Sequence, residues 1–132
     1  MSYVDGFVIA VPTANREAFV AHARQFDQLL VKEGALRVVE CWGDDVPHGK
    51  QTDFFGAVQA TADETVCFSW VEWPDKATRD SCHARMQELM ASGEFAGLLE
   101  GEMLETPFDG KRMVFGGFAP VIDMGQASTG DK

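Results

Sequence analysis

Residues 65–73, with the sequence TVCFSWVEW, constrain the fold of this chain more than any other stretch. β-Branched and aromatic side chains dominate it and Pro74 ends it, so it is expected to form a β-strand. Successive side chains of a strand point to opposite faces, and here both sets are largely apolar. We therefore predict a central strand that is covered on both faces, followed by a helix that Asp75 caps.

The remaining segments predict an α+β domain with a ferredoxin-like βαββαβ order. Thr13 or Asn15 is expected to cap the first helix, and Gly34 and Gly93 are expected to end the two helices. In this four-stranded antiparallel sheet we expect the first and third strands to lie parallel in the centre, with both helices on one face. The predicted elements are strands over 3–11, 35–42 and 111–122 and helices over 13–33 and 75–92.

Two segments depart from regular structure. The connection 43–64 is unusually long for a link between neighbouring strands. It should hold a small helix over 53–58, cover a partner, or act as a lid. In the last strand, the pair 116–117 (GG) suggests a bulge or a close approach by another backbone, and Pro120 suggests an edge position.

Composition limits the class of protein. The 132 residues, 45% of them hydrophobic, predict a single domain over 1–124 and a disordered tail over 125–132. The formal net charge of -10 repels phosphate backbones and anionic lipids, so we expect no nucleic-acid partner. No segment resembles a signal peptide or a membrane span, which favours a cytoplasmic protein without a membrane partner. The favoured state of Cys41, Cys67 and Cys82 is a reduced, buried thiol.

Short motifs along residues 3–124 resemble those of the YbaA-like family of uncharacterised bacterial proteins, and they include VDGF (4–7), GAL (34–36), FSW (68–70), PFDGKRM (107–113) and GGF (116–118). The resemblance implies membership of the dimeric α+β barrel superfamily. That superfamily also holds small cofactor-free monooxygenases, muconolactone isomerase-like enzymes and haem-binding chlorite dismutase-like proteins. The resemblance to the YbaA-like family implies no particular activity.

Glu40 and Asp5 are the candidate catalytic residues. Pairing of the second and third strands about the long connection would set Trp42 opposite Thr65 and Glu40 near Cys67, and the parallel first strand would bring Asp5 to the same level. Two carboxylates about 10 Å apart on a covered face would have raised pKa values, which suits one of them to proton transfer.

Structural roles for the same carboxylates remain open. Glu40 can instead pair with Arg37 or Arg112, and Asp5 can sit at a solvated strand end.

The candidate ligand-binding residues are aromatic or basic. An apolar pocket with a few polar groups is the usual form of a small-molecule site. Its predicted lining is Trp42, Trp70, Arg112 and Phe115, with Phe7, Trp73 and Phe118 as further aromatic candidates. The alternatives are that these aromatics form the core and that Arg112 makes a structural ion pair with Glu72.

Metal and cofactor sites are not expected. His22, His48 and His83 show no ligand spacing. His48, in the long connection, is the histidine to test as a catalytic base or haem ligand, whereas His22 and His83 are expected on helix surfaces.

Because both faces of the sheet are apolar and the two helices can cover one of them, we predict a homodimer joined through the other face. Two function classes remain open. One is a cofactor-free monooxygenase- or isomerase-like enzyme with a small-molecule ligand, and the other is a non-catalytic ligand-binding or regulatory homodimer.

Overall fold

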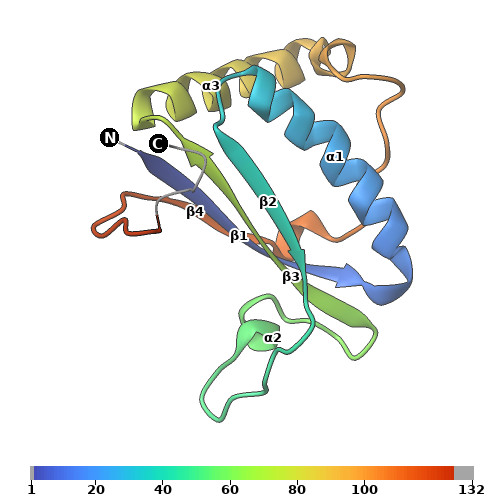
Figure 1. Cartoon of the computed structure of the whole chain (residues 1–132). Coiled ribbons are helices and arrows are strands. Elements are labelled where there is room, and N and C mark those ends of the chain that lie inside the picture. Colours follow the sequence, from blue (N-terminus) through green and yellow to red (C-terminus); the bar gives the residue numbers. More distant parts are fainter. Residues whose placement is uncertain (1, 127–132) are drawn as a thin grey trace.

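The computed structural model describes residues 2–126, and its sheet carries the two long helices on one face (Figure 1). The sheet order is β2-β3-β1-β4, which confirms the predicted βαββαβ arrangement and the edge position of β4. The strands are β1 (Tyr3–Pro12), β2 (Arg37–Trp42), β3 (Glu64–Trp73) and β4 (Val114–Phe118). The helices are α1 (Arg16–Lys32), α2 (Phe54–Ala57) and α3 (Lys76–Ser92), with 3-10 turns η1 (Thr13–Asn15), η2 (Phe95–Leu98) and η3 (Gly110–Arg112).

All neighbouring strands are antiparallel, so the prediction that β1 and β3 run parallel is wrong. Tyr3 pairs with Trp73 at one end, and Pro12 pairs with Glu64 at the other. The reason lies in the connections. The α1 crossover makes β2 parallel to β1, and β3 then returns antiparallel to β2 and therefore to β1.

The predicted register of β2 on β3 is wrong by two residues, because Trp42 faces Cys67 and Glu40 faces Ser69. A shift of two keeps every side chain on its face of the sheet, whereas a shift of one would exchange the faces. Glu40 therefore still points to the helix-covered side.

Capping of the helices is confirmed in part. The Asp75 side chain accepts a 2.7 Å hydrogen bond from Thr78 N, and Gly93 ends α3 at φ 82°. Neither predicted residue caps α1 through its side chain. Thr13 instead bonds the Thr65 hydroxyl at 2.7 Å, and Asn15 donates to the Pro107 carbonyl at 3.0 Å.

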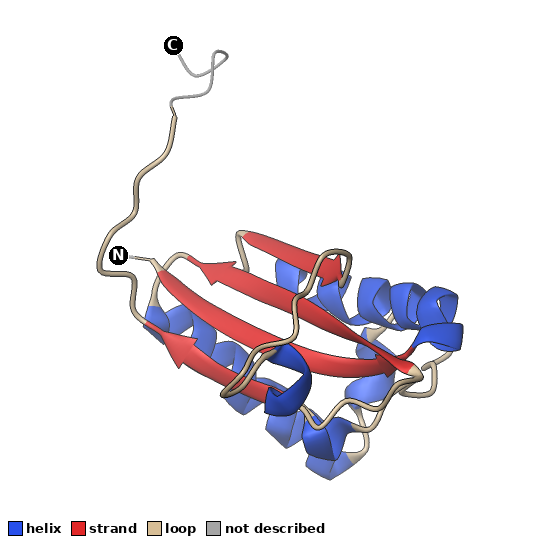
Figure 2. Ribbon diagram, turned by 90° about the horizontal axis from the view of Figure 1, so that it is seen from below, coloured by secondary structure: helices blue, strands red, loops and turns tan. Residues whose placement is uncertain are grey.

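The second face of the sheet is covered at one end by the connection between β2 and β3, which holds the predicted small helix α2 (Figure 2). Val58 of this connection packs on Ala10 and Val66. Beyond this contact the face remains apolar and exposed, with Phe68 44%, Val114 47% and Phe118 61% accessible. We call this surface the open face.

The buried-thiol prediction holds for two cysteines. Burial raises the pKa values of Cys67 and Cys82 to about 11, whereas Cys41 is half-buried. Within residues 2–126, no helix is long and apolar enough to span a membrane.

The register of β4 on β1 continues without a bulge, so that prediction is wrong. The close approach at Gly117 comes from side chains, since a Cβ there would lie 2.6 Å from Tyr3 Oη and Arg79 Nη2. Positions 127–132 of the predicted tail lie outside the described residues.

Candidate functional site

A cavity of about 360 Å³ lies between α1, the helix-covered face of the sheet and the segment 95–113. Phe7, Ile9 and Val71 form part of its floor, and the α1 side chains Phe19 and Phe26 form one wall. The size and the apolar lining fit a small-molecule site, for which roughly 300–1,000 Å³ is typical. We call it the α1 cavity.

Two acidic side chains meet at this cavity. The carboxyl groups of Asp27 on α1 and Glu40 on β2 share a hydrogen bond, and we call them the carboxyl pair. Burial, the hydrogen bond to Glu40 and the negative charge of Glu40 together raise the pKa of Asp27 to about 9, and burial contributes most. At neutral pH, Asp27 therefore holds a proton that it donates to Glu40, so the pair carries one proton and one negative charge.

The carboxyl pair also borders a groove between α1 and β2, which we call the open groove. Arg16 and Trp42 line that groove, and the Arg16 guanidinium lies 5.5 Å from the Trp42 ring centre. Both carboxyl groups border this groove, but Glu40 is exposed whereas Asp27 is half-buried. This difference supports placing the proton on Asp27, the more buried carboxyl of the two.

His22 of α1 also borders the α1 cavity, and its ring lies edge-on to Phe108 at 6.0 Å. Burial lowers the pKa of His22, and the nearby Glu40 charge opposes that shift. The imidazole is therefore neutral at pH 7 and can donate or accept a hydrogen bond. The prediction that His22 is a helix-surface residue is wrong.

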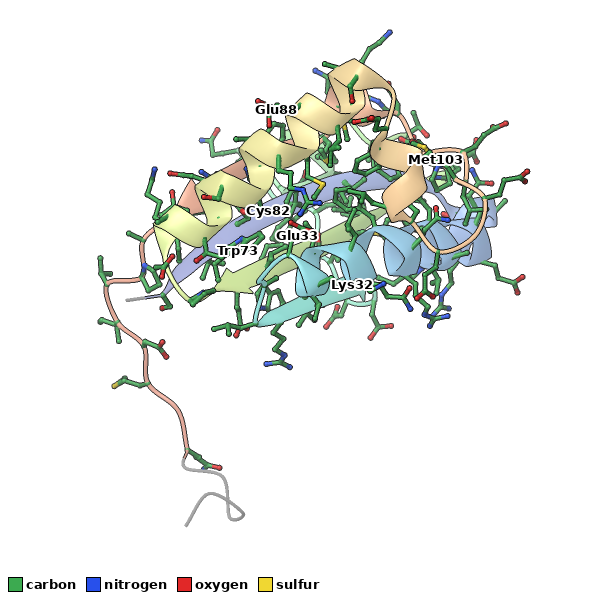
Figure 3. The ribbon with its side chains drawn as sticks, turned by 90° about the horizontal axis from the view of Figure 1, so that it is seen from above. Lys32, Glu33, Trp73, Cys82, Glu88 and Met103 are labelled. Carbon is green, nitrogen blue, oxygen red and sulfur yellow. The ribbon has the colours of Figure 1, made fainter. Side chains whose placement is uncertain are left out.

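The segment 95–113 forms another wall of the cavity, and Figure 3 shows Met103 on this segment. Gln25 of α1 holds this segment through three contacts. Its Nε2 donates to the Glu100 and Glu102 carbonyls at 3.1 and 2.7 Å, and its Oε1 accepts from Leu104 N at 3.1 Å. Gln25 therefore fastens residues 100–104 of this wall to α1, and Asn15 adds its hydrogen bond to the Pro107 carbonyl.

Asp5 does not join Glu40 at the α1 cavity. It is 2% exposed, so it does not occupy a solvated strand end. Its carboxylate accepts from Trp73 Nε1 at 2.9 Å and Arg79 Nε at 3.0 Å, and it lies 3.2 Å from His83 Nε2. This network ties β1 to β3 and α3. Because His83 contacts the buried Asp5 carboxylate, it is not the simple helix-surface residue that we predicted.

The four predicted ligand-binding residues are dispersed. Trp42 borders the open groove between α1 and β2 and packs on Phe19, with ring centres 5.9 Å apart. Trp70 points to the open face, where its Nε1 donates to Glu72 at 2.9 Å. Phe115 stacks on Phe7 at 6.3 Å but is 68% exposed.

Arg112 does not pair with Glu72 as predicted. Its guanidinium binds both carboxylate oxygens of Glu64, at 2.8 and 2.6 Å, whereas Glu72 lies 3.8 Å from Arg37. The antiparallel register explains the error. Across β1, β4 begins level with Phe68 and runs toward Glu72, so Arg112, which precedes β4, lies toward the Glu64 end of β3. Glu40 pairs with neither arginine in the described part of the chain.

His48 lies in the long connection, where it stacks on Phe55 at 4.3 Å and approaches Asp53 at 3.6 Å. It does not border the α1 cavity. Across residues 2–126, no group of three or more His, Cys, Asp or Glu side chains is arranged to hold a metal ion.

Sequence reasoning found one member of the carboxyl pair and missed the other. Asp27 follows Phe26 on α1, and no local pattern in the sequence singled it out. One weak signal was present, since Ala23, Asp27 and Leu30 lie on one side of a helix through steps of four and three.

Comparison with known proteins identifies the sequence group. Residues 2–110 match the family described as "Protein of unknown function (DUF1428)". The chain is 48% identical over 123 residues to proteins of Escherichia coli K12 and Shigella flexneri, both named "Uncharacterized protein YbaA". These alignments cover 93% of this chain and 99% of the relatives.

A solved structure also shares the fold. It is a dimeric ferredoxin-like protein from an uncultured marine organism, with a TM-score of 0.53 at 9% sequence identity. The match covers 93% of this chain and 98% of the other.

Proposed function

This chain belongs to the DUF1428 family. We propose that it is an isomerase-like enzyme without a cofactor, which binds a small apolar molecule in the α1 cavity and transfers a proton from one atom of that molecule to another. One observation carries the proposal: the carboxyl pair, with its proton on Asp27 at neutral pH, borders an otherwise largely apolar cavity. A proton donor and a proton acceptor therefore lie side by side where a ligand would bind.

The proton transfer that this pair supports is balanced. The Glu40 carboxylate removes a proton from the carbon next to a carbonyl group, and the Asp27 carboxyl gives its proton to the carbonyl oxygen. The ligand becomes an enol, and the pair still holds one proton and one negative charge. Return of a proton to a different carbon completes an isomerisation.

The apolar surroundings favour this chemistry. A charge in a largely apolar cavity interacts more strongly with its neighbours than it does in water, so the donor and acceptor act on a bound ligand with little screening. The pair also keeps a half-buried acid on α1 that makes no salt bridge within residues 2–126, and burial of such a group is unfavourable. We infer that the arrangement serves the chemistry of the site.

We further propose that the protein is a homodimer joined through the open face. Phe68, Val114 and Phe118 expose apolar surface there, and a soluble monomer rarely leaves a large contiguous patch of this kind uncovered. The segment after β4 adds Val121 and Ile122, which are 95% and 74% exposed. A second copy related by a two-fold axis would cover this surface, as the dimeric ferredoxin-like neighbour suggests.

The test is exchange of carbon-bound hydrogen in D₂O. α-Tetralone is a neutral bicyclic ketone with exchangeable hydrogens beside its carbonyl, and proton NMR follows their loss. We expect the protein to accelerate this exchange. Glu40→Gln and Asp27→Asn should each reduce the acceleration by roughly 100-fold or more, as loss of a general acid or base does.

Asp44→Asn is the matched control, because Asp44 is exposed in the connection after β2 and does not border the cavity. It should exchange at the wild-type rate. If α-tetralone binds and exchange stays at the buffer rate, the enzyme proposal fails, and the non-catalytic ligand-binding homodimer takes its place.

A further inference from the structure

Ser69 of β3 is a buried polar residue that borders the α1 cavity, and it is 3% exposed. Its hydroxyl makes no hydrogen bond to another residue in the described part of the chain. Within that part, no side-chain nitrogen or oxygen that is fully sealed from solvent lacks a partner. The Ser69 oxygen is therefore reachable by solvent, and the α1 cavity is the space that Ser69 borders.

The position of this hydroxyl is set by the sheet. Ser69 and Glu40 are directly opposite in the β2–β3 pairing, and both point to the helix-covered side. Directly opposite side chains have Cβ atoms about 5 Å apart. A ligand oxygen bound to Ser69 would therefore lie next to the carboxyl pair.

The charges around the cavity limit the ligand further. No lysine or arginine lines it, and Glu40 supplies a negative charge, so an anionic ligand would be repelled and left without a partner. A cation is disfavoured as well, because the lining is largely apolar and offers the donors of a buried cation few acceptors beyond the carboxyl pair. The cavity is suited to an uncharged molecule.

We propose that the ligand is a neutral, largely apolar molecule with one carbonyl or hydroxyl oxygen, and that Ser69 is the residue that binds this oxygen. The inference rests on the proposed use of the α1 cavity and adds the ligand class. Burying an unpaired hydroxyl is unfavourable, and a ligand oxygen would supply the missing partner. Ser69 thereby places the reactive part of the ligand beside Asp27 and Glu40.

Binding of four bicyclic probes, measured by calorimetry, tests this inference without any catalytic readout. The probes are α-tetralone, the hydrocarbon tetralin, the anion 1-naphthoate and the cation formed by 1-aminotetralin. We expect α-tetralone to bind more tightly than the other three. Ser69→Ala should weaken α-tetralone binding roughly three- to tenfold, as loss of one neutral hydrogen bond does, and leave tetralin unchanged.

Ser81→Ala is the matched control, because Ser81 is exposed on α3. It should bind all probes like the wild type. The inference is overturned if a charged probe binds as tightly as α-tetralone, if Ser69→Ala weakens the ketone and the hydrocarbon equally, or if none of the probes binds. If hydrogen exchange fails while the preference for the ketone holds, the enzyme proposal falls and the ligand class stands.

Discussion

The Asp27 carboxyl of α1 hydrogen-bonds the Glu40 carboxyl of β2, which joins the long helix to an edge strand of the sheet. Two carboxyl groups can make this contact when one of them is protonated. The contact therefore couples the protonation state of the site to the packing of α1 on the sheet.

Protein stability should fall as pH rises toward 9. The pKa of Asp27 is about 9 in the folded state and near 3.8 when unfolded, so between these values the folded state binds one proton more. The free energy of unfolding should then decrease by up to about 1.4 kcal/mol per pH unit from this group. Urea unfolding at several pH values measures the slope.

In Asp27→Asn the slope from this group should disappear, because asparagine does not titrate. Asp44→Asn should keep it. An equal slope in wild type and Asp27→Asn above pH 5 would show that Asp27 ionises normally.

Asp5→Asn should destabilise the fold. The buried Asp5 carboxylate binds Arg79, whose side chain is 19% exposed, and its loss leaves that guanidinium without its buried partner. We expect a loss of about 3 kcal/mol in the free energy of unfolding. α-Tetralone exchange per folded molecule should be unchanged, since Asp5 does not border the α1 cavity. Loss of exchange in folded Asp5→Asn would return Asp5 to the catalytic candidates.

Phe68→Glu should disrupt the proposed homodimer. Phe68 is 44% exposed on the open face, and burying a carboxylate in an apolar interface is unfavourable. Sedimentation at sub-micromolar concentration should show about twice the 14.5 kDa chain mass for the wild type and the chain mass for the variant. Val31→Glu, on an exposed site of α1, is the control and should stay dimeric. A wild-type monomer would rule out the dimer.

RNA binding should be negligible even at low salt, where electrostatic attraction is strongest. The formal charge of -10 gives a field that repels phosphates. A filter-binding assay with single-stranded and duplex RNA measures this. Salt-sensitive micromolar binding would contradict the expectation.

The fold could be predicted because its signals are local. The apolar run 65–73, the Asp75 cap and the Gly93 stop each depend on neighbouring residues, and each agrees with the structure. The order of elements then leaves few topologies. The direction of β3 relative to β1 was predicted wrongly. That error placed Asp5 level with Glu40 and Arg112 beside Glu72.

The site was harder to predict because its members meet through tertiary contacts. Glu40 stood out as a charged residue in an apolar strand, but its partner Asp27 lies in a helix with many other polar residues. Ser69 has an ordinary position in a strand, and its unused hydroxyl becomes visible when the cavity is known. The distances between such residues depend on register and helix rotation, which no local pattern determines.

The most direct test of the central claim is a carbon-13 NMR titration of the Asp27 side-chain carboxyl, assigned by comparison with Asp27→Asn. We expect a midpoint near pH 9 in the wild type. In Glu40→Gln the midpoint should fall, because the Glu40 charge is gone, but stay above the ordinary range, because burial remains. A midpoint near pH 4 in both proteins would contradict the account, since the carboxyl pair would then hold no proton at neutral pH.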